Sequence, residues 1–125
     1  MLICSLLFSS WICFQPQPIT CNPIKYEKTA IATAYTLSVQ ETDKEPCIGA
    51  GSHNLCDIVR EQPDKCIVAT RLYKLHTIIF IKGFGECEVL DRTSLKYKDR
   101  IDILFPDRES ALKFGKHQVL YKIIK

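Results

Sequence analysis

The sequence lacks several features by which common functional classes are recognised. Its basic residues are scattered singly, as Lys65, Lys74 and Lys82 illustrate, and do not form the cluster that a nucleic-acid-binding surface requires. No Gly-rich phosphate loop opens a predicted helix, and no serine lies in a nucleophile elbow. No apolar run reaches the roughly 20 residues of a membrane-spanning helix. These absences argue against nucleic-acid-binding, nucleotide-binding, serine-hydrolase and helical membrane proteins.

The composition that remains is that of an ordinary globular protein. The chain has 125 residues, of which 46% are hydrophobic and 25% charged, and this fits one domain with a modest core. The net charge is +3, and no lysine or arginine occurs before Lys25, so the basic excess lies on the part that follows. A charge of this size supports only weak attraction to an anionic polymer.

The first 21 residues differ from the rest of the chain. Residues 1–14 are almost wholly apolar and uncharged, and a Gln-Pro-Gln-Pro segment at 15–18 ends the run. This length suits the apolar region of a signal peptide, although a basic start and a small-residue cleavage site are missing. We predict a signal-like or membrane-targeting leader over 1–21 and an exported domain over 22–125. The alternative is a hydrophobic N-terminal strand in a cytosolic protein.

Seven cysteines are a high number for this length. Four of them lie in the main part of the domain, and an even number is typical of disulfide-bonded proteins in an oxidising compartment. Cys47 and Cys56 flank a Gly-containing turn, which predicts a short local disulfide. Zinc bound by thiols and His53 is the weaker alternative, because no C-x-x-C pair is present. Cys66 and Cys87 are expected to form a second bridge if their strands are neighbours.

The residue patterns predict an all-β domain with one helix. Six short segments rich in β-branched, aromatic or other apolar residues are predicted strands: 31–36, 66–70, 78–81, 86–90, 101–105 and 119–124. Asp107 as N-cap and Gly115 after the last turn delimit a predicted helix over 108–114. The connection over 37–65 is predicted as a loop that is functional or held by cross-links. Six strands with one short helix before the last strand predict a small closed β-barrel.

Two aspartates are the main candidates for function. Asp91 ends one predicted strand segment, and Asp102 lies inside the next strand between Ile101 and Ile103. A carboxylate in an apolar strand is costly unless it is paired or used in chemistry. The alternative is a structural aspartate that accepts backbone hydrogen bonds where strands cross.

The order and spacing of short motifs resemble a known family. The motifs are Thr33-Ala34-Tyr35-Thr36, Glu41-Thr42-Asp43, Pro46-Cys47, Cys66-Ile67-Val68-Ala69, Gly83-Phe84-Gly85, Val89-Leu90-Asp91-Arg92, Arg100-Ile101-Asp102-Ile103 and Ala111-Leu112-Lys113-Phe114-Gly115. Together they resemble the three-aspartate (3D) domain, a double-psi β-barrel related to the catalytic domain of membrane-bound lytic transglycosylase A and to rare lipoprotein A-like domains. The resemblance covers about residue 28 to the C-terminus. It implies a six-stranded double-psi barrel in which Asp102 is the catalytic acid and Asp91 its neighbour.

The chain also departs from the family's pattern. Thr70 stands where the family's first aspartate usually follows the second strand, and Arg92-Thr93-Ser94 replaces a common Thr-Gly-Gly. The loss of these glycines removes positions at which a backbone could approach a sugar closely. These departures favour binding of glycan over its cleavage.

The reaction implied by the resemblance needs few groups. In lytic transglycosylation, one carboxylic acid protonates the glycosidic oxygen and then takes the proton from the muramyl C6 hydroxyl, which closes a 1,6-anhydro ring. Asp102 would therefore need a pKa raised by desolvation or by a nearby like charge. Asp91 could supply that charge, whereas a close Arg100 would lower the pKa of Asp102. The sequence leaves both possibilities open.

The leading prediction is a peptidoglycan-active protein that cleaves glycan strands in the manner of a lytic transglycosylase. Tyr35, Thr36, Arg92 and Arg100 are the candidate substrate-binding residues, and neither a cofactor nor a metal is expected. We expect a monomer that is secreted or lies in the cell envelope, with peptidoglycan and no nucleic acid as partner. Any membrane association would run through the leader. The alternative is a non-catalytic peptidoglycan-binding module that uses the same residues.

Overall fold

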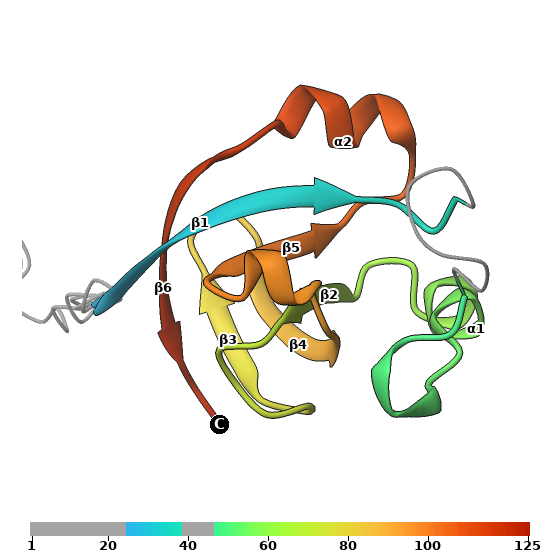
Figure 1. Ribbon diagram of the computed structural model, residues 1–125, viewed down its shortest axis with the longest axis horizontal. Helices are drawn as coiled ribbons and strands as arrows, with labels where there is room; N and C mark the ends of the chain where they lie inside the picture. The colour runs from blue at the N-terminus through green and yellow to red at the C-terminus, as the bar shows by residue number, and fades with distance from the viewer. Residues whose placement is uncertain (1–24, 39–46) are drawn as a thin grey trace, which may run out of the picture.

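The computed structural model describes residues 25–38 and 47–125, which form a mostly β structure. Six strands are hydrogen-bonded in a closed ring with the order β1-β5-β2-β4-β3-β6 (Figure 1). In chain order they are β1 Lys28–Tyr35, β2 Cys66–Thr70, β3 Ile78–Ile81, β4 Gly85–Asp91, β5 Arg100–Leu104 and β6 His117–Ile123. The six predicted strands are confirmed, although β1 begins and ends earlier in the chain than predicted.

The ring contains both parallel and antiparallel strand pairs. β1 runs parallel to β5, and β2 runs parallel to β4. The other neighbouring strands are antiparallel. Because the ring closes, each strand is hydrogen-bonded on both of its sides, and the strands that carry the two candidate aspartates, β4 and β5, both pair with β2.

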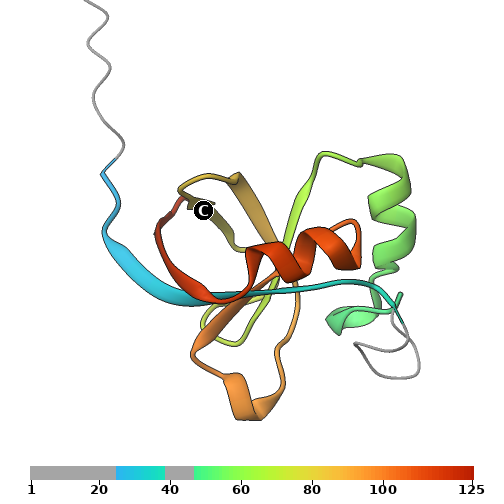
Figure 2. The same cartoon turned by 90° about the horizontal axis from the view of Figure 1, so that it is seen from above.

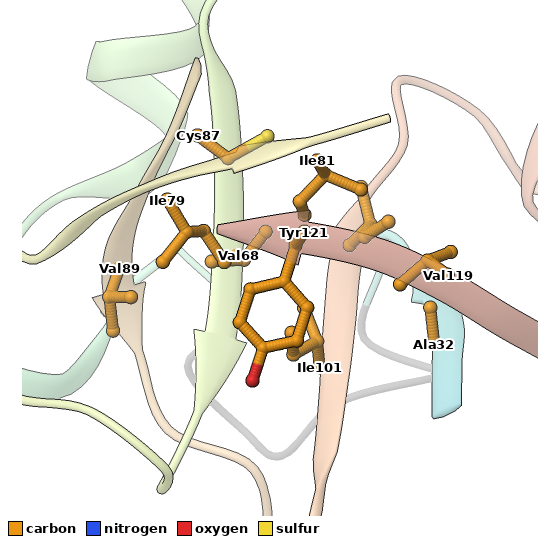
Figure 3. Packing of buried hydrophobic residues seen from close by; sticks show 10 residues of the cluster. Ala32, Val68, Ile79, Ile81, Cys87, Val89, Ile101, Val119 and Tyr121 are labelled. Atoms are coloured by element: carbon orange, nitrogen blue, oxygen red, sulfur yellow. The ribbon is translucent and has the colours of Figure 1, made fainter. Parts of the chain in front are cut away.

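The interior of the ring is apolar. Successive side chains of a strand point to opposite faces, so every second residue points inward. All six strands contribute to this core, in which the labelled side chains of Figure 3 point toward one another. Its buried members are Ala32, Val68, Ile79, Ile81, Cys87, Val89, Ile101, Ile103, Val119 and Tyr121. Since Ile101 and Ile103 point inward, Asp102 between them lies on the outer face of the ring.

The predicted helix before the last strand is confirmed as α2, Arg108–Phe114. The Asp107 side chain accepts a hydrogen bond from the backbone N–H of Ser110 at 2.8 Å, and Gly115 follows the last turn with a φ of 67°. Such a φ favours glycine, which has no Cβ to clash. The helix lies across β1 on the outside of the ring (Figure 1).

The prediction of a single helix is wrong, because α1, Leu55–Glu61, lies within the segment predicted as a loop. Asn54 is its N-cap, with the side chain accepting a hydrogen bond from the Asp57 backbone N–H at 3.0 Å. Leu55 is fully buried, and with Ile67 and Leu90 it forms a second apolar cluster on the outer face of β2 and β4. This burial stabilises a helix that is too short to form alone. Figure 2 shows α1 at the side of the ring.

Both expected disulfides are present. Cys47 and Cys56 are joined with a Cα–Cα distance of 5.0 Å, and Cys66 and Cys87 with one of 4.5 Å. The second bridge links directly paired positions of β2 and β4. These sulfurs are therefore not free thiolates, so zinc binding by Cys47 and Cys56 is not supported. Cross-links of this kind typically stabilise a small domain by about 2–4 kcal/mol each, largely by restricting the unfolded chain.

The predicted leader over 1–21 lies outside the described residues, as does the 41–46 part of the family-like motifs. In the ranges 25–38 and 47–125, no helix has the length and apolar character needed to cross a membrane.

Candidate carboxylate site

Four strands each place one residue in a continuous row on the outer face of the ring. Thr33 of β1 pairs with Asp102 of β5, and Asp102 pairs with Ala69 of β2. Ala69 in turn pairs with Asp91 of β4. Directly paired residues point to the same face of a sheet, so the two carboxylates flank the methyl group of Ala69. With neighbouring strands about 4.8 Å apart, the Cα atoms of the two aspartates lie roughly 10 Å apart.

A β-bulge in β4 directs Asp91 to this face. Val68 pairs with Val89, but the next residue of β2, Ala69, pairs with Asp91, so Leu90 is the extra residue of the bulge. Strict alternation would direct Asp91 into the core together with Val89. Leu90 instead packs in the apolar cluster under α1. The bulge therefore brings Asp91 to the same side as Asp102.

Three hydrogen-bond donors fix the carboxylate of Asp91. Its Oδ1 accepts from the backbone N–H groups of Ala50 at 3.0 Å and of Arg92 at 2.8 Å. Its Oδ2 accepts from the hydroxyl of Tyr35 at 3.4 Å. Donors from three separate parts of the chain therefore hold this carboxylate in one orientation.

The Ala50 donor belongs to a short 3-10 turn, η1 (Ala50–Ser52), that lies against β4. The disulfide between Cys47 and Cys56 closes the loop that contains this turn. At Gly49, an added Cβ would lie 2.9 Å from the carbonyl oxygen of Leu90, so the close approach requires glycine. Nothing in the sequence marks Ala50 as a site residue. Its contribution is a backbone N–H, which every residue except proline carries and which leaves no signal in the sequence.

Asp102 is partly buried and has a different environment. Its Oδ1 accepts a hydrogen bond from the Thr33 hydroxyl at 3.1 Å. Burial raises the pKa of Asp102 from 3.8 to about 6, against the lowering effects of the Thr33 hydrogen bond and the Arg100 charge. The charge of Asp91 adds a smaller upward effect. Desolvation thus has a larger effect on this pKa than the charge of either Arg100 or Asp91. Roughly a tenth of the Asp102 side chains are protonated at pH 7.

Tyr35 donates to Asp91 and lies near enough to Asp102 for the charges of both carboxylates to act on its hydroxyl. Burial is the main cause of a pKa well above the usual value for its hydroxyl, and the charges of Asp91 and Asp102 raise this pKa further. The hydroxyl therefore stays protonated near neutral pH and is able to donate to Asp91. Thr36, the next predicted substrate-binding residue, is 4% exposed. Sugar binding by either residue stays a prediction.

The side chains of the two arginines predicted to bind substrate contact other groups of the protein. Arg100 stacks on Tyr97, with its guanidinium carbon 4.2 Å from the ring centroid. Arg92 donates through Nη1 to the backbone carbonyls of Thr70 and Tyr73. The hydrogen bond of Arg92 to Asp91 comes from its backbone N–H. Their binding to substrate also stays a prediction.

The arrangement joins a carboxyl group able to carry a proton near neutral pH to a second carboxylate in a fixed position. Such a pair suits proton transfer to and from a bound ligand. Within the described part of the chain, no group of three or more histidine, cysteine, aspartate or glutamate side chains is placed to hold a metal ion.

A comparison with known proteins found one similar sequence. The chain is similar to a cell wall shaping protein. This protein, YabE of Bacillus subtilis (strain 168), is 26% identical over 99 residues, which cover 77% of the chain and 22% of YabE. The chain therefore spans about a fifth of the length of YabE, and the similarity is that of one domain to part of a longer protein. No family model matches the chain.

Proposed function

We propose that this chain is an exported double-psi β-barrel that acts on peptidoglycan. The closed ring, its two parallel strand pairs and the helix before the last strand support this type of barrel. The similarity to YabE supports a role at the cell wall. Two disulfides support export, because such bonds persist mainly in oxidising compartments. The expected location is the cell envelope or the medium.

The leading function is cleavage of glycan strands by the lytic transglycosylase reaction. Protonated Asp102 donates its proton to the glycosidic oxygen as the bond from that oxygen to the muramyl C1 breaks. The resulting carboxylate takes the proton of the muramyl C6 hydroxyl, whose oxygen bonds to C1 and closes the 1,6-anhydro ring. The proton returns to Asp102, so neither water nor a second base is consumed. The negative charge of Asp91 would stabilise the positive charge that develops near C1.

The observation that carries this proposal is the pKa of Asp102, which burial raises to about 6. Asp102 lies on the same face of the ring as Asp91. A group with a pKa near the working pH can both donate and accept a proton in one catalytic cycle. An aspartate with the ordinary pKa of 3.8 would be protonated in fewer than roughly one molecule in a thousand at pH 7.

A second candidate function is a non-catalytic peptidoglycan-binding module. Thr70 stands where the resembling domains usually carry their first aspartate, and it is fully buried with its hydroxyl donating to the Arg100 carbonyl oxygen at 2.9 Å. This position therefore supplies no third carboxylate. Thr93, in the segment that replaces the glycines, is 7% exposed and donates to the Tyr97 carbonyl oxygen. Both observations favour a structural use of these positions.

Mass spectrometry of the products from purified protein and peptidoglycan distinguishes the two functions. We expect 1,6-anhydro muropeptides from the wild type, at a rate that falls as the pH rises above about 6, because protonated Asp102 is then depleted. Asp102→Asn should abolish the products and leave peptidoglycan binding intact. Asp91→Asn should retain part of the activity. Asp99→Asn, at an exposed position in the β4–β5 connection, is the matched control and should change nothing.

The outcomes separate clearly. Wild-type protein that binds peptidoglycan but releases no anhydro product would overturn the enzyme assignment in favour of the binding module. Absence of both binding and products would overturn both functions.

A further inference from the structure

An open hollow of about 550 Å³ lies at the end of the ring where β2 and β4 finish and β3 begins. Its lining includes four cationic residues, and none of the described residues that line it is an aspartate or glutamate. The four are Arg71, Lys74, Arg92 and Lys125. We propose that this hollow binds anionic oxygen groups of a wall polymer, with the carboxylates of peptidoglycan stem peptides as its ligands.

Backbone carbonyls hold both guanidinium groups of the hollow in place. Arg92 donates through Nη1 to the carbonyl oxygens of Thr70, at 2.7 Å, and of Tyr73, while Arg71 donates through Nε to the carbonyl oxygen of Thr93. Nη1 accounts for two of the five N–H donors of a guanidinium, so the donors on Nε and Nη2 of Arg92 remain. Both Nη groups of Arg71 remain as well. Arginines fixed in advance in this way lose little freedom when a planar carboxylate binds.

The cations of the hollow are not neutralised by neighbouring acids. The ion pairs recorded between described residues involve Asp57, Glu88 and Glu109, and none of these pairs includes Arg71, Lys74 or Arg92. Positive charges that lie together on one concave surface attract an anionic ligand.

The apolar part of the lining decides between two kinds of anion. Tyr73 and Ile123 contribute apolar surface beside the cations. A short peptide brings carboxylates together with aliphatic groups and can cover both kinds of surface. A phosphodiester polymer brings charge with little apolar surface. The mixed lining therefore favours a peptide carboxylate over a phosphate group.

Residues around the hollow directly follow two members of the carboxylate row in the chain. Asp91 is followed in the chain by Arg92, and Ala69 is followed by Thr70, whose carbonyl oxygen holds the Arg92 side chain. A glycan strand bound beside Asp102 would therefore have an attached stem peptide close to the hollow. The identity of the polymer rests on the proposed function, but the binding of anions can be measured without any cleavage.

The test measures binding to insoluble peptidoglycan with its stem peptides and to the same glycan after an amidase has removed them. Arg71→Gln and Lys74→Gln each remove one positive charge from the hollow. Lys82→Gln removes the same charge from an exposed position between β3 and β4, at the opposite end of β3, and is the matched control. All variants also carry Asp102→Asn, which prevents cleavage during the measurement.

We expect each substitution in the hollow to weaken binding to peptide-bearing peptidoglycan about three- to tenfold at low salt. This loss should shrink as added salt screens the charges, and Lys82→Gln should bind like its parent. Removal of the stem peptides should weaken binding by the parent and leave little difference between the parent and Lys74→Gln. If Arg71→Gln fails to fold because its bond to Thr93 is lost, the exposed Lys74 still provides the test.

Two results would overturn the inference. Equal binding by Lys74→Gln and Lys82→Gln would show that the hollow takes no anion. Stronger competition by poly(glycerol phosphate) than by a soluble stem peptide would assign the site to phosphate and refute the carboxylate. A protein that shows the expected losses of binding, while its form with intact Asp102 releases no anhydro product, would retain the anion site and lose only the proposed cleavage.

Discussion

Replacement of Asp102 by asparagine should stabilise the folded protein at pH 8, which distinguishes a functional from a structural aspartate. Asparagine has the same shape and keeps the Oδ1 that accepts the Thr33 hydrogen bond. It removes only the negative charge, which is partly buried on the outer face of β5. A structural aspartate that depends on its charge would show the opposite change.

The magnitude follows from the pKa of Asp102. This pKa rises from 3.8 to about 6 on folding, and each pKa unit corresponds to about 1.4 kcal/mol, so the ionised side chain destabilises the fold by at most about 3 kcal/mol. Solvent still reaches the side chain, and we therefore expect Asp102→Asn to raise the free energy of unfolding by about 1–3 kcal/mol at pH 8. The folded state binds the proton more tightly, so wild-type stability should rise as the pH falls from about 6 to 3.8. Below this window the difference between wild type and variant should vanish.

Urea denaturation at a series of pH values between 3.5 and 8, with the disulfides intact, measures this difference. Asp91→Asn is the contrasting variant, because it replaces a carboxylate that accepts three hydrogen bonds, and it should lose about 1–2 kcal/mol at pH 8. A loss of stability in Asp102→Asn at pH 8, or a difference from wild type that does not change with pH, would refute the assignment of desolvation as the main influence on Asp102.

Two further substitutions test the parts of the fold that support the site. Gly49→Ala should reduce stability by about 1–3 kcal/mol in urea denaturation, because the new Cβ would lie 2.9 Å from a backbone oxygen of β4. An unchanged midpoint would show that η1 does not depend on this close approach. Leu55→Ala should cost about 2–5 kcal/mol, since the side chain is fully buried under α1. Leu112→Ala, at a position 67% exposed on α2, is its control, and equal losses in both variants would contradict the packing of α1.

The strands could be predicted from the sequence because their signals are local. Runs of β-branched, aromatic and other apolar residues predicted all six strands, and Asp107 and Gly115 predicted both ends of α2. The helix α1 could not be found in the same way. It has 7 residues in a segment that also contains glycine and proline, and its apolar positions extend over about two turns. It forms because Leu55 packs against strands that are distant in the sequence.

The chemistry of the site was less predictable than its residues. Alternation along β4 directs Asp91 inward, and only the bulge at Leu90, a property of strand pairing, corrects this. The pKa of Asp102 depends on how deeply several strands and connections bury it, and no local pattern reports that depth. The Ala50 donor is a backbone group and depends on where the loop closed by the disulfide comes to rest.

The bulge at Leu90 has a consequence for changes in chain length. Substitutions at position 90 keep the number of residues between Gly85 and Asp91, so they leave the carboxylate on the outer face. Deletion of Leu90 would place Asp91 directly after Val89, in a regular ladder that still pairs it with Ala69, and would remove only the apolar side chain that packs under α1. Insertion of one residue between Val89 and Asp91 would instead enlarge the bulge or move Asp91 away from Ala69 along β2. The site should therefore tolerate the loss of the bulged residue better than the gain of a residue in β4. Chains that share the site are best sought by counting residues along paired strands.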